Sequence, residues 1–402
     1  MREWLHPISR ETGRMLDSLS GSAAQFSLDA DQIVIRDMAR AFSDEVIAPN
    51  AVAWDEAKYF PVAEMRKAAA LGMGGIFIAE DVGGSGLSRL AATLIFEALA
   101  TGCPTVSAYM SIHNMTAGLI DAFGSNEQRR RWLPRLCTME LLASYCLSEA
   151  GAGSDAAALS TRATRDGDQY MLNGQKQFIS GAGVSDLYVV MARTGGEGPS
   201  GISALIVPSD IPGLSFGANE RKMGWNAQPT RAVTFQNARI PVGNRLGAEG
   251  SGFKIAMVGL DGGRLNIAAC SLGGAQCAFE KTLAYMRERK AFGRPLDAFQ
   301  ALQFRLADMA TGLEASRTLL WRAAAALDRK DPRATGLSAM SKRFITDTCF
   351  DIANQALQLH GGYGYLSEYG IEKIVRDLRV HQILEGTNEI MRLIVARSLV
   401  GR

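Results

Sequence analysis

The spacing of apolar residues changes twice along this chain of 402 residues. From Ser27 onward, apolar residues such as Val34, Met38 and Phe42 recur at four-residue spacing, which is typical of amphipathic helices. Near Ala143 the pattern changes to short apolar runs separated by turn residues, and from Phe253 the helical period returns. We therefore predict a mostly α chain with a central β domain. The expected parts are a mobile lead-in over 1–26, a helical domain over 27–142, a β domain over 143–250 and a helical bundle domain over 251–402.

Turn and capping residues mark the ends of several predicted elements. Asp29 and Gln32 can form a variant capping box for the first helix, which Pro49 is expected to end. Asn173-Gly174 is typical of a two-residue turn and predicts a hairpin of two short strands. The regular spacing of the strands indicates an antiparallel barrel or sandwich. Further strands are predicted over 187–192, 202–207 and 231–235, and further helices over 62–71, 90–100, 253–286 with an interruption at Gly262-Gly263, 298–327, 334–359 and 388–400.

Charge and cysteine placement exclude several classes of protein. Lys plus Arg number 43 and Asp plus Glu number 41, which gives no reason to expect nucleic acid or a membrane as a partner. No apolar run reaches transmembrane length. The six cysteines are scattered without a CxxC pair, so we expect reduced thiols of an intracellular protein and no metal site. The first residues lack the apolar core of a secretory signal, and their acidic residues argue against a transit peptide.

The stretch HQILEGTNEIM over 381–391 contains the strongest candidate for a catalytic group. Glu385 follows two apolar residues, and desolvation by such neighbours raises the pKa of a carboxyl. Gly386 directly after it allows a ligand to approach closely. The functional interpretation is a general base at a loop-to-helix junction. The alternative is an ordinary helix start whose acidic residue favours the helix dipole.

Several separate stretches carry a resemblance to a known family. They are YCLSEAGAGSD at 145–155, KQFIS at 176–180, RKAFG at 289–293, QLHGGYGY at 358–365 and the stretch at 381–391. In this order and with this spacing they resemble the acyl-CoA dehydrogenases, and the resemblance covers nearly all of residues 28–400. It implies a helical N-terminal domain, a β-barrel or sandwich middle domain, a C-terminal four-helix bundle, and a homotetramer built as a dimer of dimers.

Other stretches narrow the implied substrate. Those over 60–70, 81–90, 95–103 and 224–233 are similar to family members that oxidise isobutyryl-CoA to methacrylyl-CoA in valine degradation. The resemblance also implies electron transfer flavoprotein as the electron acceptor. Three alternatives stay open: another short or 2-methyl-branched acyl-CoA dehydrogenase, an acyl-CoA oxidase, and a non-catalytic CoA-binding module of the same fold. The expected compartment is the bacterial cytoplasm, or the mitochondrial matrix for a eukaryotic chain whose leader has been removed.

Dehydrogenation of a thioester requires a base for the α-proton, donors for the developing enolate oxygen and an acceptor for the β-hydride. No side chain accepts a hydride, so a cofactor is needed, and the resemblance implies FAD with the hydride passing to flavin N5. It implies Glu385 as the base. In a second family arrangement the base stands directly before an arginine, and Gly263 occupies that position here without a carboxylate. The Glu385 N–H and a flavin ribityl hydroxyl are implied to hold the thioester oxygen.

The resemblance assigns the remaining site residues, with the group around 358–362 reaching the FAD of a neighbouring subunit. Many relatives carry tryptophan at the position of Phe178. Acyl-CoA contacts are implied for Ser154, Asp261, Gly262, Gly263, Arg264 and Arg397. FAD contacts are implied for Tyr145, Cys146, Leu147, Ser148, Glu149, Ala150, Gly151, Ala152, Gly153, Ser154, Phe178, Ile179, Ser180, Arg289, Phe299, Gln300, Gln358, Leu359, His360, Gly361, Gly362, Thr387, Asn388 and Glu389.

Each of these groups also has an interpretation without function. The glycines over 151–153 fit a strand-end turn, Phe178 a buried strand aromatic, and Arg289 a solvated helix end. Gly361 fits a helix C-cap, Gly262-Gly263 a helix kink, and Arg397 a surface position. His381 and Trp225 are expected to be structural supports.

Overall fold

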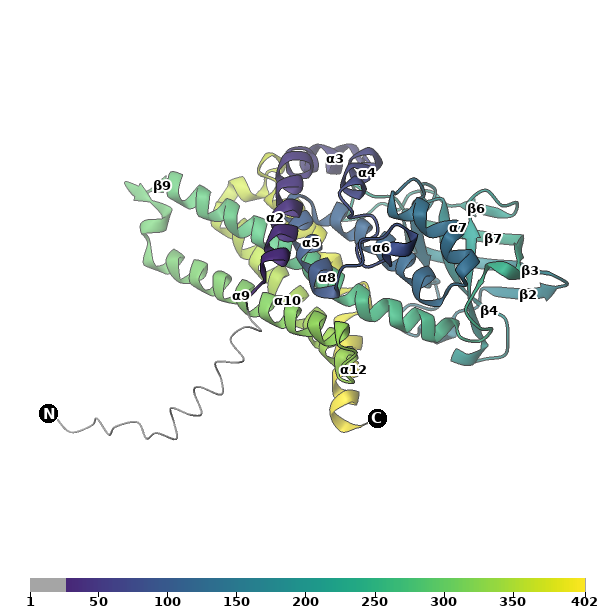
Figure 1. The fold of residues 1–402 in the computed structure, drawn as a ribbon. Coiled ribbons are helices and arrows are strands. Elements are labelled where there is room, and N and C mark those ends of the chain that lie inside the picture. Colours follow the sequence, from purple (N-terminus) through teal and green to yellow (C-terminus); the bar gives the residue numbers. More distant parts are fainter. Residues whose placement is uncertain (1–26, 402) are drawn as a thin grey trace, which may run out of the picture.

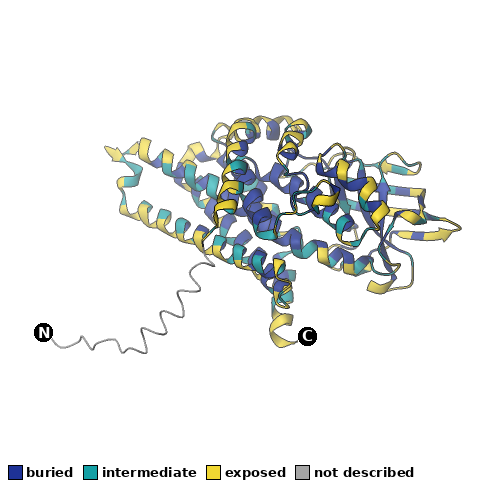
Figure 2. Cartoon of the chain, viewed as in Figure 1, coloured by how far each residue is buried: buried dark blue, intermediate teal, exposed yellow. Residues whose placement is uncertain are grey.

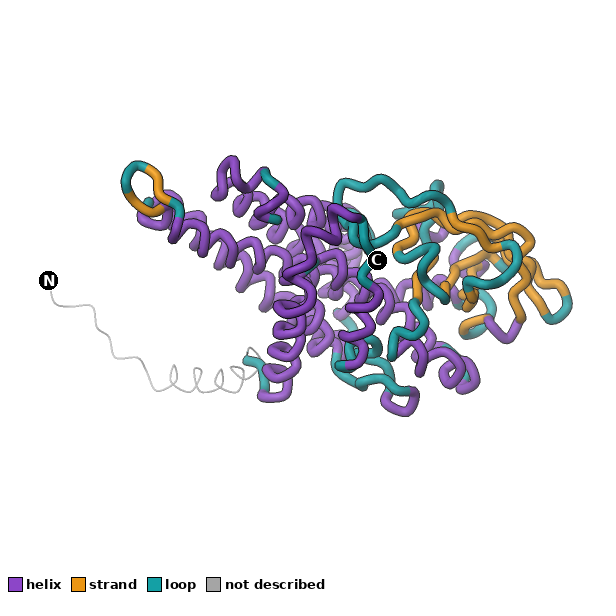
Figure 3. Tube along the Cα trace, turned by 90° about the horizontal axis from the view of Figure 1, so that it is seen from above, coloured by secondary structure: helices purple, strands orange, loops and turns teal. Residues whose placement is uncertain are grey.

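The computed structural model describes residues 27–401, so the predicted lead-in over 1–26 lies outside the described residues. Helices and strands separate in space: a long helical bundle occupies one end of the molecule and the sheet the other (Figure 1). The view from above shows the same segregation (Figure 3). The predicted order of helical, β and helical regions, and the mostly α fold class, are confirmed.

Among the helices before the sheet, α6 packs against α5 and α7. This helix is buried on all sides over most of its length, including polar residues such as His113 and Asn114. A helix buried all round shows no amphipathic period, which is why its apolar pattern does not predict it. The six helices are α2 Ala30–Phe42, α3 Ala51–Ala57, α4 Val62–Ala70, α5 Arg89–Gly102, α6 Pro104–Phe123 and α7 Asn126–Cys137.

The start of the first helix is confirmed, but its predicted end is wrong. Asp29 and Gln32 form the expected capping box at the start of α2. The α-helix ends at Phe42, and a π turn over Ser43–Ile47 and a 3-10 turn over Ala48–Asn50 continue it into α3. Pro49 lies in that 3-10 turn. Proline is tolerated in the first turn of a helical segment because the N–H it lacks would have no partner there.

The middle region is one eight-stranded sheet, in which β4 Leu187–Arg193 and β5 Ile202–Pro208 are central and buried on both faces. One face packs on α7, and the other is covered by the curled ends of the sheet itself. The Tyr188 ring on β4 contacts Phe216 on β6, with 5.6 Å between ring centroids, although three strands separate β4 from β6 in the sheet order. The other strands are β1 Ala143–Cys146, β2 Arg162–Asp166, β3 Gln169–Ser180, β6 Leu214–Phe216, β7 Thr230–Pro241 and β8 Arg245–Leu246.

The predicted hairpin at Asn173-Gly174 is wrong. These residues lie inside β3, a single strand, and the pairing of β3 with β7 shifts register between Leu172 and Gly174. A Cβ at Gly174 would lie 2.6 Å from the Thr161 hydroxyl, so glycine is needed there for close approach of two backbones. The actual two-residue turn is Gly167-Asp168, between β2 and β3. A turn signal inside a strand here marks an irregularity in pairing instead of a chain reversal.

Long helices return after the sheet and form the bundle. Helix α8 is continuous through Gly262-Gly263, so the predicted interruption is wrong. Two glycines weaken a helix by about 1 kcal/mol each but do not stop it when packing supports it. A short antiparallel pair, β9 Lys290–Ala291 and β10 Arg294–Pro295, joins α8 to α9. The helices are α8 Gly252–Glu288, α9 Gln300–Asp328, α10 Ala334–His360, α11 Ile371–Arg379 and α12 Asn388–Val400.

One hydrophobic core joins the first helices to the bundle. It runs from Phe96 on α5 and Tyr109 on α6 to Leu265 on α8, Leu313 on α9 and Ile345 on α10. Buried residues accordingly follow the inner faces of these helices, and exposed residues follow the outer faces (Figure 2). The inner half of α8 is thereby held rigidly between the two helical regions.

Candidate active site

Glu385 lies in the short link between the 3-10 turn Val380–Gln382 and α12. Its backbone is left-handed, with φ of 55°, and Gly386 follows with φ of 87°. A left-handed non-glycine residue costs free energy and occurs often at functional sites. Thr387 caps α12 by accepting a hydrogen bond from the Ile390 N–H at 3.4 Å. The strained link therefore determines where the Glu385 side chain points.

Oε2 of Glu385 is buried, although the residue as a whole is only half-buried. Its Oε2 atom has no hydrogen-bond partner among residues 27–401. Burial raises the pKa of this carboxyl to about 7, although the positive charges of Arg264 and Lys342 lower it. The raised pKa expected from the sequence is present, but of the two apolar residues before Glu385, Ile383 is 50% exposed and Leu384 is half-buried. Other elements that surround the carboxylate therefore contribute to its burial.

Gly263 on α8 faces this carboxylate. A Cβ built at Gly263 would lie 2.5 Å from Oε2 of Glu385 and 3.0 Å from Sδ of Met115, which comes from α6. Of the two glycines that were expected to interrupt α8, Gly263 makes room beside the acid, whereas a Cβ at Gly262 would lie 2.8 Å from the Arg89 guanidinium. The absence of a side chain at Gly263 allows Glu385 to occupy this position.

Arg264 provides the fixed positive charge next to Gly263. It is buried and forms an ion pair with Asp261 at 2.6 Å. The second carboxylate oxygen of Asp261 accepts a hydrogen bond from the Thr335 hydroxyl at 2.7 Å. Arg264 Nε has no partner among the described residues. The ion pair with Asp261 thus holds the Arg264 guanidinium close to Glu385, and the Nε–H of Arg264 is left without an acceptor among the described residues.

The segment predicted to contact the cofactor begins beside this cluster. Tyr145, at the end of β1, has a buried hydroxyl without a partner in the described part of the chain. Burial and the charge of Glu385 raise the pKa of the Tyr145 hydroxyl well above its usual value. Further along, Gly151 and Gly153 face open space, so nothing would obstruct a Cβ at either position. Ser154 is exposed.

Glu149 in the same segment is fully engaged within the protein. It forms a buried ion pair with Lys176 at 2.8 Å and accepts hydrogen bonds from Ser160 and Thr161. Burial alone would raise the pKa of Glu149, but the Lys176 charge and these hydrogen bonds bring it to about 2. Its side chain therefore fixes the loop onto β3 and has no carboxylate oxygen free for a ligand.

Phe178 projects from β3 at an irregularity in the strand. The register of β3 with β7 shifts between Lys176 and Ile179, and Phe178 has a left-handed φ of 62°. Its ring is 65% exposed, so the alternative of a buried strand aromatic is wrong. The Gln177 N–H donates to the Ser148 carbonyl at 2.9 Å, which places Phe178 beside the 145–154 segment. The bulge thus presents a flat apolar surface next to the open glycines.

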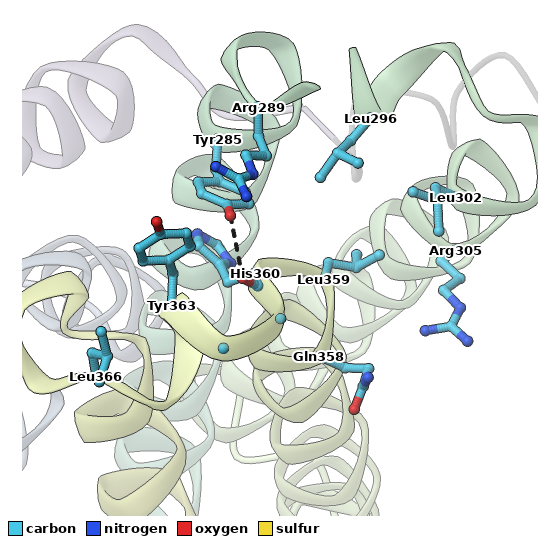
Figure 4. Close-up of a pocket in the computed structure, with 12 residues that line it drawn as sticks. Tyr285, Arg289, Leu296, Leu302, Arg305, Gln358, Leu359, His360, Tyr363 and Leu366 are labelled. Atoms are coloured by element: carbon cyan, nitrogen blue, oxygen red, sulfur yellow. Dashed lines mark hydrogen bonds between the residues drawn. The ribbon is translucent and has the colours of Figure 1, made fainter. Parts of the chain in front are cut away.

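A second group of predicted residues lines a pocket of about 610 Å³ where α8 and α10 end (Figure 4). Arg289 lies over the Tyr363 ring at 5.2 Å from its centroid. Tyr285 stacks on His360 and donates a hydrogen bond to the His360 carbonyl at 3.3 Å. The other predicted residues in its lining are Gln358, Leu359, Gly361 and Gly362.

The predicted cofactor residues therefore lie in two separate places. The pocket lies near β9, at the far end of the bundle from the sheet that carries the 145–154 segment and Phe178 (Figures 1 and 3). Phe299 and Gln300 also lie at that end, where the Phe299 ring contacts Arg294 at 4.0 Å. A single chain does not bring the two groups together around one small molecule.

Three family models cover the chain almost end to end. The N-terminal domain of acyl-CoA dehydrogenases matches residues 29–140, the middle domain 144–238 and the C-terminal domain 250–400. The chain belongs to the acyl-CoA dehydrogenase family. It is an oxidoreductase, and the resemblance that its motifs carry is confirmed.

Two curated relatives are identical to this acyl-CoA dehydrogenase at more than half of the aligned residues. Mitochondrial isobutyryl-CoA dehydrogenase of Dictyostelium discoideum is 57% identical over 92% of this chain and 90% of its own. The Bos taurus protein of the same name is 56% identical over 93% and 90%.

Solved structures share its fold. Butyryl-CoA dehydrogenase from Megasphaera elsdenii has a TM-score of 0.91 at 36% identity, covering 93% of this chain and 99% of that one. A chain in a structure described as an electron transferring flavoprotein of Acidaminococcus fermentans has a TM-score of 0.92 at 38% identity, covering 94% and 100%. PigA with FAD and proline has a TM-score of 0.90 at 30% identity, covering 93% and 99%.

Several residues around Glu385 were not singled out as site residues from the sequence. Lys342 on α10 and Met115 on α6 are both buried against the Glu385 link or its carboxylate. A lysine on the apolar stripe of a predicted helix was an available signal for Lys342, because a lysine is almost never buried without a specific partner. Met115 gave no signal, since one methionine in an apolar helix is ordinary.

The remaining predicted residues lie at the edges of these two groups. Asn388 is buried directly after the Glu385 link, and Glu389 is exposed. Arg397 is exposed near the end of α12. No group of three or more His, Cys, Asp or Glu residues within 27–401 could hold a metal ion. In the same part of the chain, every helix is too short or too polar to span a membrane.

Proposed function

We propose that the protein catalyses the FAD-dependent α,β-dehydrogenation of a short branched-chain acyl-CoA, with isobutyryl-CoA to methacrylyl-CoA as the best candidate reaction. One observation carries this proposal above the others. A carboxylate with a pKa near 7, whose buried oxygen has no partner among residues 27–401, stands at a strained link, opposite a residue without a side chain. Such a group is poised to accept a proton at neutral pH.

Glu385 is the base in this reaction. Its Oε2 accepts the α-proton, because that atom has an unused acceptor site facing the space beside Gly263. The Glu385 N–H makes no hydrogen bond to an acceptor within residues 27–401, so it is free to donate to the thioester oxygen. Stabilising negative charge on that oxygen makes the α-proton more acidic. Arg264 and Lys342 favour the ionised base before the transfer.

The residues present fit FAD as the cofactor. Tyr145 offers a buried hydroxyl without a partner in the described part of the chain, and Gly151 and Gly153 leave the backbone open to a ligand. Phe178 offers an exposed ring beside them. FAD, when bound, supplies the two-electron acceptor that no side chain can provide. In this proposal Tyr145, the 145–154 backbone and Phe178–Ser180 hold its ring system next to Glu385.

The second pocket supports a tetramer in which neighbouring subunits complete each cofactor site. Arg289, Gln358 and Gly361 lie too far along the bundle to reach the ring site of their own chain. Arg289 suits a phosphate because a guanidinium is always charged and donates in a fork. We therefore infer a homotetramer, a dimer of dimers, in which this pocket receives the pyrophosphate and adenine side of a neighbour's FAD.

The names of the relatives support the substrate and the electron acceptor. The two curated relatives are isobutyryl-CoA dehydrogenases, which favours isobutyryl-CoA over straight short chains. Asp261, Gly262, Gly263 and Arg264 are then the acyl-CoA contacts on α8. The similar chain in the electron transferring flavoprotein structure favours that flavoprotein as the acceptor. The mitochondrial matrix is the compartment for a eukaryotic chain, and the bacterial cytoplasm otherwise.

An anaerobic titration of the purified protein with a panel of acyl-CoAs tests the proposal. Loss of flavin absorbance should be steepest with isobutyryl-CoA, weaker with butyryl-CoA and absent with CoA alone. The Glu385→Gln variant should keep FAD while turnover falls at least about a thousandfold, because its amide cannot accept the proton. An unbleached flavin with every thioester would refute the activity, and full turnover of the variant would refute the base assignment.

A further inference from the structure

Lys342 lies on the core-facing side of α10 and is fully buried. Its ammonium group donates hydrogen bonds to the Gly386 carbonyl at 2.8 Å and to Oδ1 of Asn388 at 2.9 Å. Gly386 lies directly after Glu385 in the link, and Asn388 is the first residue of α12. A buried lysine is costly unless its charge has partners, and here its partners are the link that carries the base and the start of the helix that follows.

The same face of α10 holds Asn388 through further bonds. The Asn388 amide donates to Oδ1 of Asp347 at 2.7 Å and to the Thr346 hydroxyl at 3.0 Å. Lys342 and Thr346 are one helical turn apart, so a single face of α10 binds the link at adjacent points. The start of α12 is thereby tied to a rigid helix of the bundle.

The position of this contact matters because the Glu385 backbone is strained. On the N-terminal side, the N–H groups of Ile383 and Leu384 bond to the Val380 carbonyl at 2.9 and 3.0 Å. On the C-terminal side, Lys342 holds the carbonyl of Gly386. Left-handed geometry at a non-glycine residue persists only when the surroundings enforce it. Lys342 supplies that constraint at the residue next to the base.

The charged groups around the two side chains come from several elements. Glu385 faces Arg264 of α8 and Lys342 of α10, together with the Tyr145 hydroxyl of β1. Lys342 is also influenced by Asp347 of α10 and Glu389 of α12. Burial lowers the pKa of Lys342 to about 8, against the nearby charge of Glu385, which raises it. The ammonium form therefore predominates at pH 7.

We propose that Lys342 is a positioning residue for the dehydrogenation: it holds the link at Gly386 and Asn388 so that the Glu385 carboxylate faces Gly263, and its charge favours the ionised base. This inference rests on Glu385 being the base. Lys342 acts by holding the link and by the electrostatic effect of its charge on Glu385. Its ammonium group donates hydrogen bonds to Gly386 and Asn388 and does not touch the reacting carbons.

The Lys342→Met variant of the FAD-loaded protein tests the proposal, with Lys222→Met as the matched control. Lys222 is also partly buried, donates to the Gln228 carbonyl at 2.7 Å and to the Thr230 hydroxyl at 2.8 Å, and has a pKa lowered to about 8. The hydrogen-bond partners of Lys222 lie in the middle region, away from the Glu385 link. Both variants lose one buried ammonium group, but only one loses it beside the base.

We expect Lys342→Met to move the acidic limb of the kcat/KM profile upward by about one pH unit, a tenfold change in proton affinity. At pH 7 kcat should fall about tenfold or more, with KM changed less than about threefold, and part of the loss should be recovered at pH 9. Lys222→Met should lower Tm but leave the pH profile unchanged. Lys342→Arg, which keeps the charge, should leave the acidic limb in place while kcat falls.

Two results would overturn the inference: an unshifted acidic limb with wild-type kcat in Lys342→Met, or an equal shift in Lys222→Met. If the methionine variant does not retain FAD, Lys342→Gln gives the same comparison, since it keeps one donor for Gly386 but no charge. The Glu385→Gln variant shows whether a negative result refutes only the role of Lys342 or also the role of Glu385 as the base. An inactive Glu385→Gln beside a normal Lys342→Met would refute the role of Lys342 alone.

Discussion

The backbone of Gly263 lies directly against the carboxylate of Glu385, so that a Cβ on Gly263 would come within 2.5 Å of Oε2 and 2.9 Å of Cδ. Real Cβ atoms do not approach other heavy atoms this closely. A side chain at position 263 and the observed position of the Glu385 carboxylate therefore exclude one another. This relationship explains why glycine is accepted at position 263 in the middle of a long helix, where it costs stability.

Gly263→Ala should displace the base. We expect kcat/KM to fall about tenfold or more, because an acid moved by about 1 Å is poorly placed for proton transfer. FAD content should stay unchanged. Gly259→Ala, one turn earlier on α8, is the control: its Cβ would meet only the flexible Leu119 side chain, at 3.3 Å. Steady-state kinetics of the two variants check this, and normal activity of Gly263→Ala would contradict the packing argument.

The raised pKa of Glu385 should make stability depend on pH. Its folded pKa of about 7 lies above the usual value of 4.5, so the fold favours the uncharged acid. That contribution is fully present below about pH 4.5 and is lost as pH rises through 7. Glutamine at position 385 does not titrate, so the Glu385→Gln variant should not lose this contribution to stability as the pH rises.

Melting curves at pH 5.5 and pH 8.5 measure this effect. The Tm of Glu385→Gln minus that of the wild type should increase by roughly 2 °C or more between the two values. For the control Glu389→Gln, at an exposed position on α12, the Tm of the variant minus that of the wild type should be the same at both pH values. The wild-type kcat/KM should also fall on the acidic side of about pH 7, and a flat profile down to pH 5 would contradict the raised pKa.

Arg289→Ala should weaken cofactor retention more than substrate affinity. The guanidinium lies at the mouth of the 610 Å³ pocket, held over Tyr363, and is exposed for contact with an anionic group. Its loss removes a charge-assisted contact of about 1.5–3 kcal/mol. Dialysis followed by flavin absorbance measures retention. Arg287→Ala, an exposed neighbour on the same helix end, should retain FAD like the wild type, and equal losses in both variants would point to net charge alone.

His381→Phe should loosen the turn that precedes the base. Trp225 donates its indole N–H to Nε2 of His381 at 3.1 Å, and Nδ1 of His381 bonds to the Ser271 hydroxyl at 2.7 Å. Burial lowers the pKa of His381 to about 3, so the ring is neutral and donates once and accepts once. Phenylalanine leaves the indole donor unpaired, which should cost about 1–3 kcal/mol of unfolding free energy.

The coupling between His381 and Trp225 can be measured directly. Denaturant unfolding of Trp225→Phe, His381→Phe and the double variant forms a thermodynamic cycle. The combined loss should be smaller than the sum of the single losses, because both changes remove the same hydrogen bond. Full additivity would show that the indole and imidazole do not stabilise one another.

The errors in the sequence analysis have a common physical origin. A turn dipeptide, Asn173-Gly174, lies within a strand because the backbone of Thr161 passes too close for a side chain there. A glycine pair, Gly262-Gly263, does not break α8 because packing on both sides holds the helix. In each case the local signal for glycine was correct, but the reason was an approach by a distant part of the chain.

The sequence by itself determined the order of helical and β regions, the family and the identity of the acidic residue, because periodicity and motif spacing are properties of neighbours along the chain. Only the tertiary structure decided what surrounds that acid. Gly263, Met115, Lys342 and Tyr145 come from four different elements that meet around the carboxylate; burial among them raises its pKa, and the Lys342 charge limits that rise. Burial depends on contacts between residues far apart in sequence, and no local pattern records them.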